Sequence, residues 1–257
     1  MKVVILAGGL GTRLSERTDR IPKPMVEIGG RPIVWHVMKH YAQSGFTDFT
    51  IALGYLGEIV KRYFVDYHRL SGNLVVNLES GVTDVERHHN EDWTVRLLDT
   101  GADTNTGGRV ERVLPALGRE PFLLTYCDGV SDVDLAALVN LHRESDNLVT
   151  LTAVRPPARF GGLELDGHRV SAFTEKPQVG EGWINGGFMV VEPEISDYLE
   201  GDETSFEYDA LERVAEEGRL GAYKHEGYWQ CMDTLRELRI LQELWRSGNA
   251  PWRTWKG

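Results

Sequence analysis

Short apolar runs alternate with amphipathic helical segments along most of this 257-residue chain. The apolar runs predict β-strands at 3–6, 49–53, 74–78, 95–98, 122–126, 148–154, 170–173 and 188–191. Helical periodicity predicts helices at 32–43, 57–70, 133–144, 206–217 and 234–247. Strands followed by helices of this length are typical of βαβ units. The sequence therefore predicts an α/β fold, Rossmann-like, in which helices flank a mostly parallel mixed sheet.

The predicted elements show no linker, repeat or low-complexity tract between them, so we expect a single domain over residues 1–257. The strands become shorter and the turns more frequent after about residue 160. We expect a smaller α+β portion there, at about 161–257, joined to a larger portion at about 1–160. The polar, glycine-rich stretch at 100–109 is expected to be a mobile surface loop.

Charge and composition limit the classes of ligand. The formal net charge of −11 disfavours non-specific binding to nucleic acid. Residues 1–40 nevertheless hold seven Lys and Arg against three acids, which favours a small anionic ligand. We expect neither a membrane span nor a signal peptide, since an apolar run of sufficient length is missing. Two cysteines form no disulfide framework, which fits the cytoplasm.

The first predicted strand leads directly into a glycine-rich segment, LAGGLGTRL. Gly8, Gly9 and Gly11 would let backbone N–H groups converge on an anion without obstruction by a Cβ atom. The segment has neither the Gly-Lys-Ser/Thr of a Walker A loop nor the third glycine of a dinucleotide fingerprint. Arg13 and Lys23 follow closely and supply the positive charge that a polyphosphate requires. The segment therefore predicts a phosphate-binding loop, with a structural turn between solvated charges as the alternative.

Two aspartates are candidate metal ligands. Asp128 follows the apolar run PFLLTY and so lies at the carboxyl end of a predicted strand, where open α/β sheets bind ligands. Asp233 precedes a predicted helix. Two carboxylates from distant segments suit a phosphate-bound Mg²⁺, which keeps water and substrate oxygens in its other positions. The structural alternatives are a turn residue at Asp128 and a helix N-cap at Asp233.

Several motifs together carry a family resemblance. LAGGLGTRL followed by PKPMVEIGGRPIVWH resembles the signature of the sugar-1-phosphate nucleotidyltransferases. The remaining motifs are similar to one branch of that superfamily, the glucose-1-phosphate cytidylyltransferases. These motifs are TGGR at 106–109, DGVSDVD at 128–134, EKP at 175–177, INGGF at 184–188, WQCMDTLRE at 229–237 and APWRTW at 250–255.

The resemblance implies that CTP and glucose 1-phosphate react with Mg²⁺ to give CDP-glucose and pyrophosphate, in a homo-oligomer. It implies a nucleotide-binding portion at about 1–160 and a sugar-binding portion after it, with Arg13 and Lys23 as the catalytic residues. It places nucleotide binding at Leu6, Ala7, Gly8, Gly9, Gly11, Thr12, Arg13, Lys23, Thr104, Arg109 and Cys127. It places sugar-phosphate binding at Tyr126, Glu175, Lys176, Asn185 and Gly186, and metal binding at Asp128 and Asp233. Thr104 and Arg109 are expected to reach the triphosphate as their loop closes.

Two positions depart from the family pattern. Cys127 stands where that pattern has glycine, and Cys231 stands where it has proline. Cys127 adds a side chain beside the expected nucleotide pocket, so another base (UTP or dTTP) or another sugar 1-phosphate stays open. A non-catalytic, nucleotide-sugar-binding regulatory protein is a further alternative, which the retained Arg13, Lys23 and aspartates disfavour. A dinucleotide-binding oxidoreductase is disfavoured by the missing third glycine.

Overall fold

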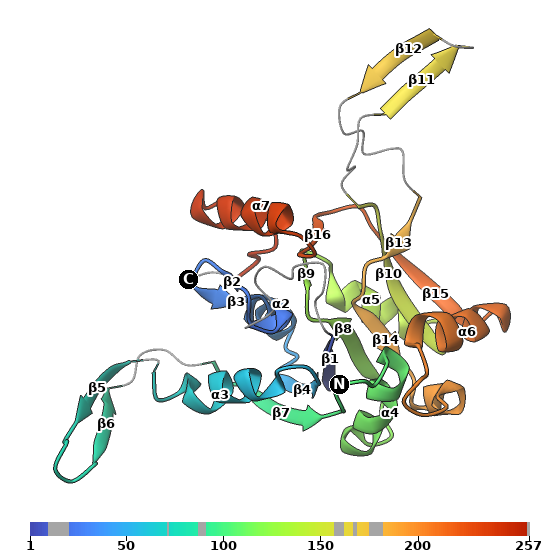
Figure 1. Ribbon diagram of the computed structural model, residues 1–257. Helices are drawn as coiled ribbons and strands as arrows, with labels where there is room; N and C mark the ends of the chain where they lie inside the picture. Colours follow the sequence, from blue (N-terminus) through green and yellow to red (C-terminus); the bar gives the residue numbers. More distant parts are fainter. Residues whose placement is uncertain are drawn as a thin grey trace.

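The computed structural model describes residues 1–9, 21–70, 72–86, 91–156, 162–166, 169–174 and 182–255 (Figure 1). A large mixed sheet lies at its centre. Its strands, in spatial order, are β13 (Ile184–Asn185), β10 (Val149–Val154), β14 (Met189–Val191), β8 (Phe122–Tyr126), β1 (Val3–Ala7), β4 (Asp48–Leu53) and β7 (Thr94–Asp99), and β15 (Leu220–His225) pairs with β10.

The sheet is parallel from β7 to β8 and mixed from β8 to β13. Strands β7, β4, β1 and β8 all run parallel, whereas β14 is antiparallel to both β8 and β10. Strand β15 pairs with β10 in parallel. The predicted mostly parallel mixed sheet is therefore confirmed, and this one sheet contains strands from both the earlier and the later part of the chain.

Strand β1 shows why this sheet is buried on both faces. Its five residues, VVILA, are all buried, as expected for a central parallel strand. Because side chains alternate along a strand, Val3, Ile5 and Ala7 pack into one core. Val4 and Leu6 pack into a second core on the opposite face. The strand therefore joins two helical layers and directs its carboxyl end toward the glycine-rich segment.

Helices cover the two faces of the sheet. The first core receives α2 (Ile33–Gln43), α3 (Gly57–Tyr67) and α5 (Leu135–Arg143). The second core receives α4 (Thr106–Leu117), η3 (Pro193–Tyr198), the π-helical turn η4 (Phe206–Leu211) and α6 (Glu212–Glu216). Helix α7 (Leu235–Arg246) lies apart from both and packs into a third core.

Helix α4 is the main difference from the sequence-based expectation. Thr106–Arg109 were expected to belong to a loop, but they form the first turn of this helix. Two glycines and Pro115 lower the helix propensity of the segment, which hid it. A Cβ atom on Gly107 would lie 2.7 Å from the Thr204 carbonyl oxygen, and one on Gly108 would lie 2.7 Å from the Asp202 Cα atom. The glycines therefore allow close packing against the segment before η4.

Within the described residues, the other strands form four short antiparallel ladders. They are β2 (Glu27–Ile28) with β3 (Arg31–Pro32), β5 (Asn73–Val76) with β6 (Thr83–Glu86), β9 (Gly129–Ser131) with β16 (Trp229–Cys231), and β11 (Gly162–Asp166) with β12 (Arg169–Thr174). The β5–β6 and β11–β12 hairpins extend away from the body of the molecule (Figure 1). Within the described part of the chain, every helix is too short or too polar to cross a bilayer.

The third core is built around a buried histidine. The His36 side chain is fully buried among Trp35, Trp245, Trp252 and Trp255. Its Nε2 atom lies 2.9 Å from the Ile28 carbonyl oxygen, and its Nδ1 atom lies 3.4 Å from the Trp252 indole nitrogen. Because an indole N–H can only donate, Nδ1 accepts and Nε2 carries the hydrogen. Burial lowers the pKa of this imidazole to about 4.

Acidification is expected to destabilise the protein through His36. Between pH 6.5 and about 4 the unfolded chain binds a proton that the folded chain excludes, so the free energy of unfolding falls as pH falls. The contribution of His36 over this range is about 2–3 kcal/mol. Urea unfolding at pH 7.5 and pH 4.5, followed by tryptophan fluorescence, measures it. The loss should be smaller in His36→Gln and unchanged in the exposed His68→Gln; equal losses in all three proteins would contradict the assignment.

Candidate active site

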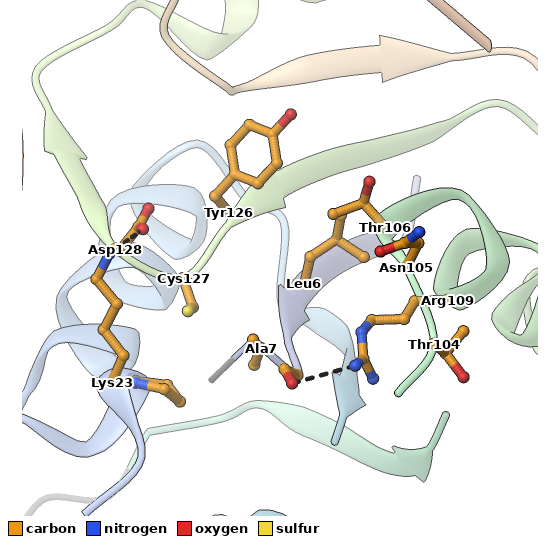
Figure 2. A pocket seen from close by; sticks show the side chains of 13 residues that line it. Leu6, Ala7, Lys23, Thr104, Asn105, Thr106, Arg109, Tyr126, Cys127 and Asp128 are labelled. Atoms are coloured by element: carbon orange, nitrogen blue, oxygen red, sulfur yellow. Dashed lines mark hydrogen bonds and ion pairs between the residues drawn. The ribbon is translucent and has the colours of Figure 1, made fainter. Parts of the chain in front are cut away.

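A cavity of about 280 Å³ lies at the carboxyl ends of β1 and β8 (Figure 2). It is lined by Leu6, Ala7, Gly8, Gly9, Lys23, Pro24, Thr104, Asn105, Thr106, Arg109, Tyr126, Cys127 and Asp128. The lining includes every predicted nucleotide-binding residue within the described ranges. Gly11, Thr12, Arg13, Glu175 and Lys176 lie outside those ranges. The structure thus brings together segments that the sequence analysis selected separately.

The β9–β16 ladder brings the two predicted metal ligands together. Asp128 directly precedes β9, and Asp233 lies two residues after Cys231, the last residue of β16. In the ladder Cys231 pairs with Gly129, and the Met232 N–H donates to the Asp128 carbonyl oxygen at 2.8 Å. Antiparallel pairing therefore holds these two aspartates, 105 positions apart in sequence, at one end of the ladder.

Lys23 joins the two carboxylates. Its Nζ atom lies 2.6 Å from Asp128 Oδ2 and also donates to Asp233 Oδ1. The three side chains are 12%, 28% and 17% exposed for Lys23, Asp128 and Asp233, so the cluster is partly shielded from water. Burial by itself would lower the pKa of Lys23, but the Asp128 carboxylate and hydrogen bonds to both aspartates raise that pKa above its usual value. The ammonium is therefore charged throughout the physiological range.

Asp233 is not the N-cap of helix α7, which was the structural alternative for this residue. Thr234 is the N-cap of α7: its hydroxyl accepts from the Glu237 N–H, and the Glu237 carboxylate accepts from the Thr234 N–H. This reciprocal pair is a capping box and satisfies the first turn of the helix. The Asp233 carboxylate is thereby left to bind Lys23.

Neither cysteine supplies a thiolate to this site at neutral pH. Cys127 is buried and lines the cavity beside Asp128, while Cys231 is partly exposed. Burial is the main reason that the pKa of each thiol is raised to about 12. Both side chains therefore act as neutral groups, and Cys127 contributes shape rather than charge to the cavity wall.

Arg109 holds the walls of the cavity together. The residue is 4% exposed, and its guanidinium donates to the Gly8 carbonyl after β1, the Leu53 carbonyl at the end of β4, and the Thr100 hydroxyl after β7. It also donates to the Gly101 and Ala102 carbonyls of the loop after β7. These donor–acceptor distances range from 2.7 to 3.2 Å. One side chain from α4 therefore links the carboxyl ends of three parallel strands.

Two glycines make room for that guanidinium. A Cβ atom on Gly8 would lie 2.2 Å from the Arg109 Cζ atom. One on Gly54 would lie 2.6 Å from both the Arg109 Nη1 atom and the Gly8 carbonyl oxygen. Gly8 is thus needed for packing against Arg109 as well as for any approach of a ligand to the backbone. Gly54 has the same packing role, and the sequence analysis did not select it.

The predicted sugar-binding loop is tied to the aspartate-bearing ladder. The Asn185 side chain accepts from the Gly187 N–H at 2.9 Å, which shapes the turn. The Trp229 indole N–H, from β16, donates to the Gly186 carbonyl at 2.8 Å. A Cβ atom on Gly186 would lie 2.6 Å from Val154, so only glycine fits there. Trp229, which the sequence analysis did not select, therefore helps to position this loop.

Comparison with known proteins places the chain in a family. Residues 2–240 match the nucleotidyl transferase family. The chain belongs to this family. It is 46% identical over 257 residues to the glucose-1-phosphate cytidylyltransferase of Salmonella typhi, with 100% of both chains covered. The same identity and coverage hold for the glucose-1-phosphate cytidylyltransferase of Salmonella typhimurium.

Solved structures of this nucleotidyl transferase fold agree with the architecture. HddC from Yersinia pseudotuberculosis, solved with GMP-PN, superimposes with a TM-score of 0.68 at 24% identity, covering 95% of this chain and 99% of that one. The inositol-1-phosphate CTP transferase from T. maritima gives a TM-score of 0.63 at 14% identity, covering 95% of each chain. At these identities the likeness concerns the fold.

Proposed function

We propose that this nucleotidyl transferase family member transfers the cytidylyl group of CTP to glucose 1-phosphate, releasing pyrophosphate and forming CDP-glucose. The observation that carries the proposal is the Lys23–Asp128–Asp233 cluster at one end of a glycine-lined cavity. The 46% identity over the full length to two glucose-1-phosphate cytidylyltransferases supports the choice of base and sugar.

The reaction needs no nucleophile from the protein. An oxygen of the sugar phosphate attacks the α-phosphorus of CTP, forming a new P–O bond while the bond from that phosphorus to the β-phosphate oxygen breaks. Both reactants are anions, so the protein must hold them in line and offset their charge. Lys23 is proposed to do this for the reacting phosphate, and the Gly8–Gly9 backbone for the leaving pyrophosphate. Arg13, with Gly11 and Thr12, is proposed to complete the phosphate site.

The pair Asp128 and Asp233 fits a divalent metal. Their carboxylates come from distant segments and already converge on one cation, the Lys23 ammonium. Within the described ranges, three or more His, Cys, Asp or Glu side chains do not gather into a metal cluster, so phosphate oxygens and water would complete the coordination. When bound, Mg²⁺ supplies charge neutralisation at the phosphates. The protein's part is to hold the two carboxylates on one side of the cavity.

Sugar recognition is proposed for the INGGF loop, which lies beside Tyr126 of the cavity lining. Asn185 and the Gly186 backbone are held there by β13 and Trp229, and amide groups pair well with sugar hydroxyls. Glu175 and Lys176 are proposed to contribute from the preceding segment. We also propose a homo-oligomer, which the exposed apolar side chains of the β5–β6 hairpin support: Leu74 is 44% exposed and Val75 is 68% exposed.

A substrate matrix tests the function directly. Each of CTP, UTP, dTTP, GTP and ATP is incubated with glucose 1-phosphate, mannose 1-phosphate and galactose 1-phosphate, and pyrophosphate release is measured. We expect the highest kcat/KM for CTP with glucose 1-phosphate, and loss of turnover with excess EDTA. A higher kcat/KM for another pair would show that the protein makes a different nucleotide-sugar. Absence of turnover with every pair would favour the non-catalytic regulatory alternative.

A further inference from the structure

Glu207 lies behind the cavity wall and binds two of its hydroxyl groups. The residue belongs to the π-helical turn η4, which is capped by Ser205. Its Oε1 atom accepts from the Tyr126 hydroxyl at 2.6 Å, and its Oε2 atom accepts from the Thr106 hydroxyl at 2.6 Å. Oε2 also accepts from the Ser205 hydroxyl at 3.1 Å. A single-turn π-helix is often found beside a functional site, because its wider turn redirects side chains.

These hydrogen bonds fix the direction of both hydroxyl hydrogens. A carboxylate has no hydrogen to donate, so Tyr126 and Thr106 must each donate their only hydrogen to Glu207. The Thr106 oxygen also accepts from the Phe206 N–H at 2.9 Å, which leaves one lone pair. Toward any ligand in the cavity, the two hydroxyl oxygens are therefore acceptors only.

The two hydroxyls lie away from the phosphate end of the cavity. In Figure 2, Lys23 and Asp128 lie on one side, Thr104, Asn105 and Thr106 on the other, with Leu6 and Tyr126 between them. The Tyr126 hydroxyl points toward the Thr106 side (Figure 2). If the phosphates lie against Lys23 and the glycine backbone, the nucleobase of the same molecule reaches the side that holds these two acceptors.

We propose that Glu207 is a positioning residue for nucleobase choice: by fixing Tyr126 and Thr106 as acceptors, it makes the cavity favour a base that presents an amino group over one that presents a carbonyl. This deepens, and rests on, the proposed cytidylyl transfer. Cytosine carries an amino group where uracil and thymine carry a carbonyl oxygen. A carbonyl facing two fixed acceptors has no hydrogen to share and leaves them unpaired, which costs binding.

Glu207→Gln tests the proposal because it alters donors and acceptors while keeping shape. The glutamine amide has one accepting oxygen and one donating NH₂ group. The hydroxyl that faces the NH₂ group must turn its hydrogen toward the cavity, where it can bind a carbonyl. We expect the ratio of kcat/KM for CTP to kcat/KM for UTP to fall about tenfold or more, with KM for glucose 1-phosphate unchanged. Titration of CMP and UMP by calorimetry should show the same loss of preference without turnover.

Two further variants make the test decisive. Glu212→Gln makes the same chemical change at an exposed site in the next turn, and should leave the CTP-to-UTP ratio unchanged. Tyr126→Phe removes one acceptor without disturbing a charge, and should also lower the ratio, so it decides the matter if Glu207→Gln unfolds.

An unchanged ratio in Glu207→Gln and Tyr126→Phe would overturn the role of Glu207. So would a change confined to KM for glucose 1-phosphate, since the hydroxyls would then read the sugar. A wild-type chain that binds and turns over UTP in preference to CTP would instead overturn the proposed function, so the two failures are distinguishable.

Discussion

Lys23→Met is expected to lower kcat/KM by about 10²–10³-fold, the scale seen when one preorganised charged group is removed from a transition state. The Nζ atom of Lys23 is the positive charge that lies between Asp128 and Asp233, at the end of the cavity where we propose that the phosphates bind. Methionine keeps most of the unbranched apolar side chain and removes the ammonium group, with its charge and its hydrogen-bond donors. Steady-state pyrophosphate release with CTP and glucose 1-phosphate measures the loss.

The same variant should bind a divalent cation more tightly in the absence of substrate. With the ammonium gone, two carboxylates face each other without a counter-charge, so the affinity for Mn²⁺ should rise about tenfold, as measured by electron paramagnetic resonance of free Mn²⁺. Lys39→Met is the matched control, because Lys39 is similarly shielded and paired with Glu91 but lies outside the cavity lining. Wild-type turnover and unchanged Mn²⁺ affinity in Lys23→Met would refute the proposed roles of the cluster.

The fold was predictable where a segment's local pattern and its burial agree. In the VVILA run and in the helix that begins after Pro32, the local pattern and the burial agree. Both elements lie within one residue of their predicted ends. Helix α4 was hidden because Gly107 and Gly108 are poor helix formers whose packing against the Thr204 segment is not visible in local sequence. Strand β15 was missed for a related reason, since its partly exposed residues gain strand structure from pairing with β10.

The site was predictable as a set of segments and not as a network of contacts. Glycine-rich backbone, lysine and aspartates are recognisable by residue type, and those within the described ranges do converge. Glu207 and Trp229 act through other residues, so their roles depend on which carbonyl or hydroxyl lies across the fold. The segment FEYDAL, at the start of a predicted helix, does not indicate by its sequence that Glu207 binds hydroxyl groups elsewhere in the fold.

Substitution of Arg109 is expected to have the largest effect on the free energy of unfolding. Arg109→Lys should lower the free energy of unfolding by about 3–5 kcal/mol, because removal of a buried donor leaves several acceptors unpaired. The acceptors are one hydroxyl and four backbone carbonyls around the ends of β1, β4 and β7. A lysine ammonium keeps the charge but concentrates its hydrogens at one point, so it cannot span them as a planar guanidinium does. Urea unfolding at pH 7.5 measures the change.

Arg112→Lys is the control on the same helix. Arg112 is 44% exposed and pairs with Asp202 at 2.6 Å, so its replacement should change the free energy of unfolding by less than about 1 kcal/mol. The comparison also separates two roles for Arg109. If Arg109→Lys unfolds at the wild-type urea concentration and only raises KM for CTP, the guanidinium acts on the triphosphate, as the family resemblance implies. If the free energy of unfolding falls and added CTP restores only part of it, the main role of Arg109 is to hold three strand ends in the positions that form the cavity.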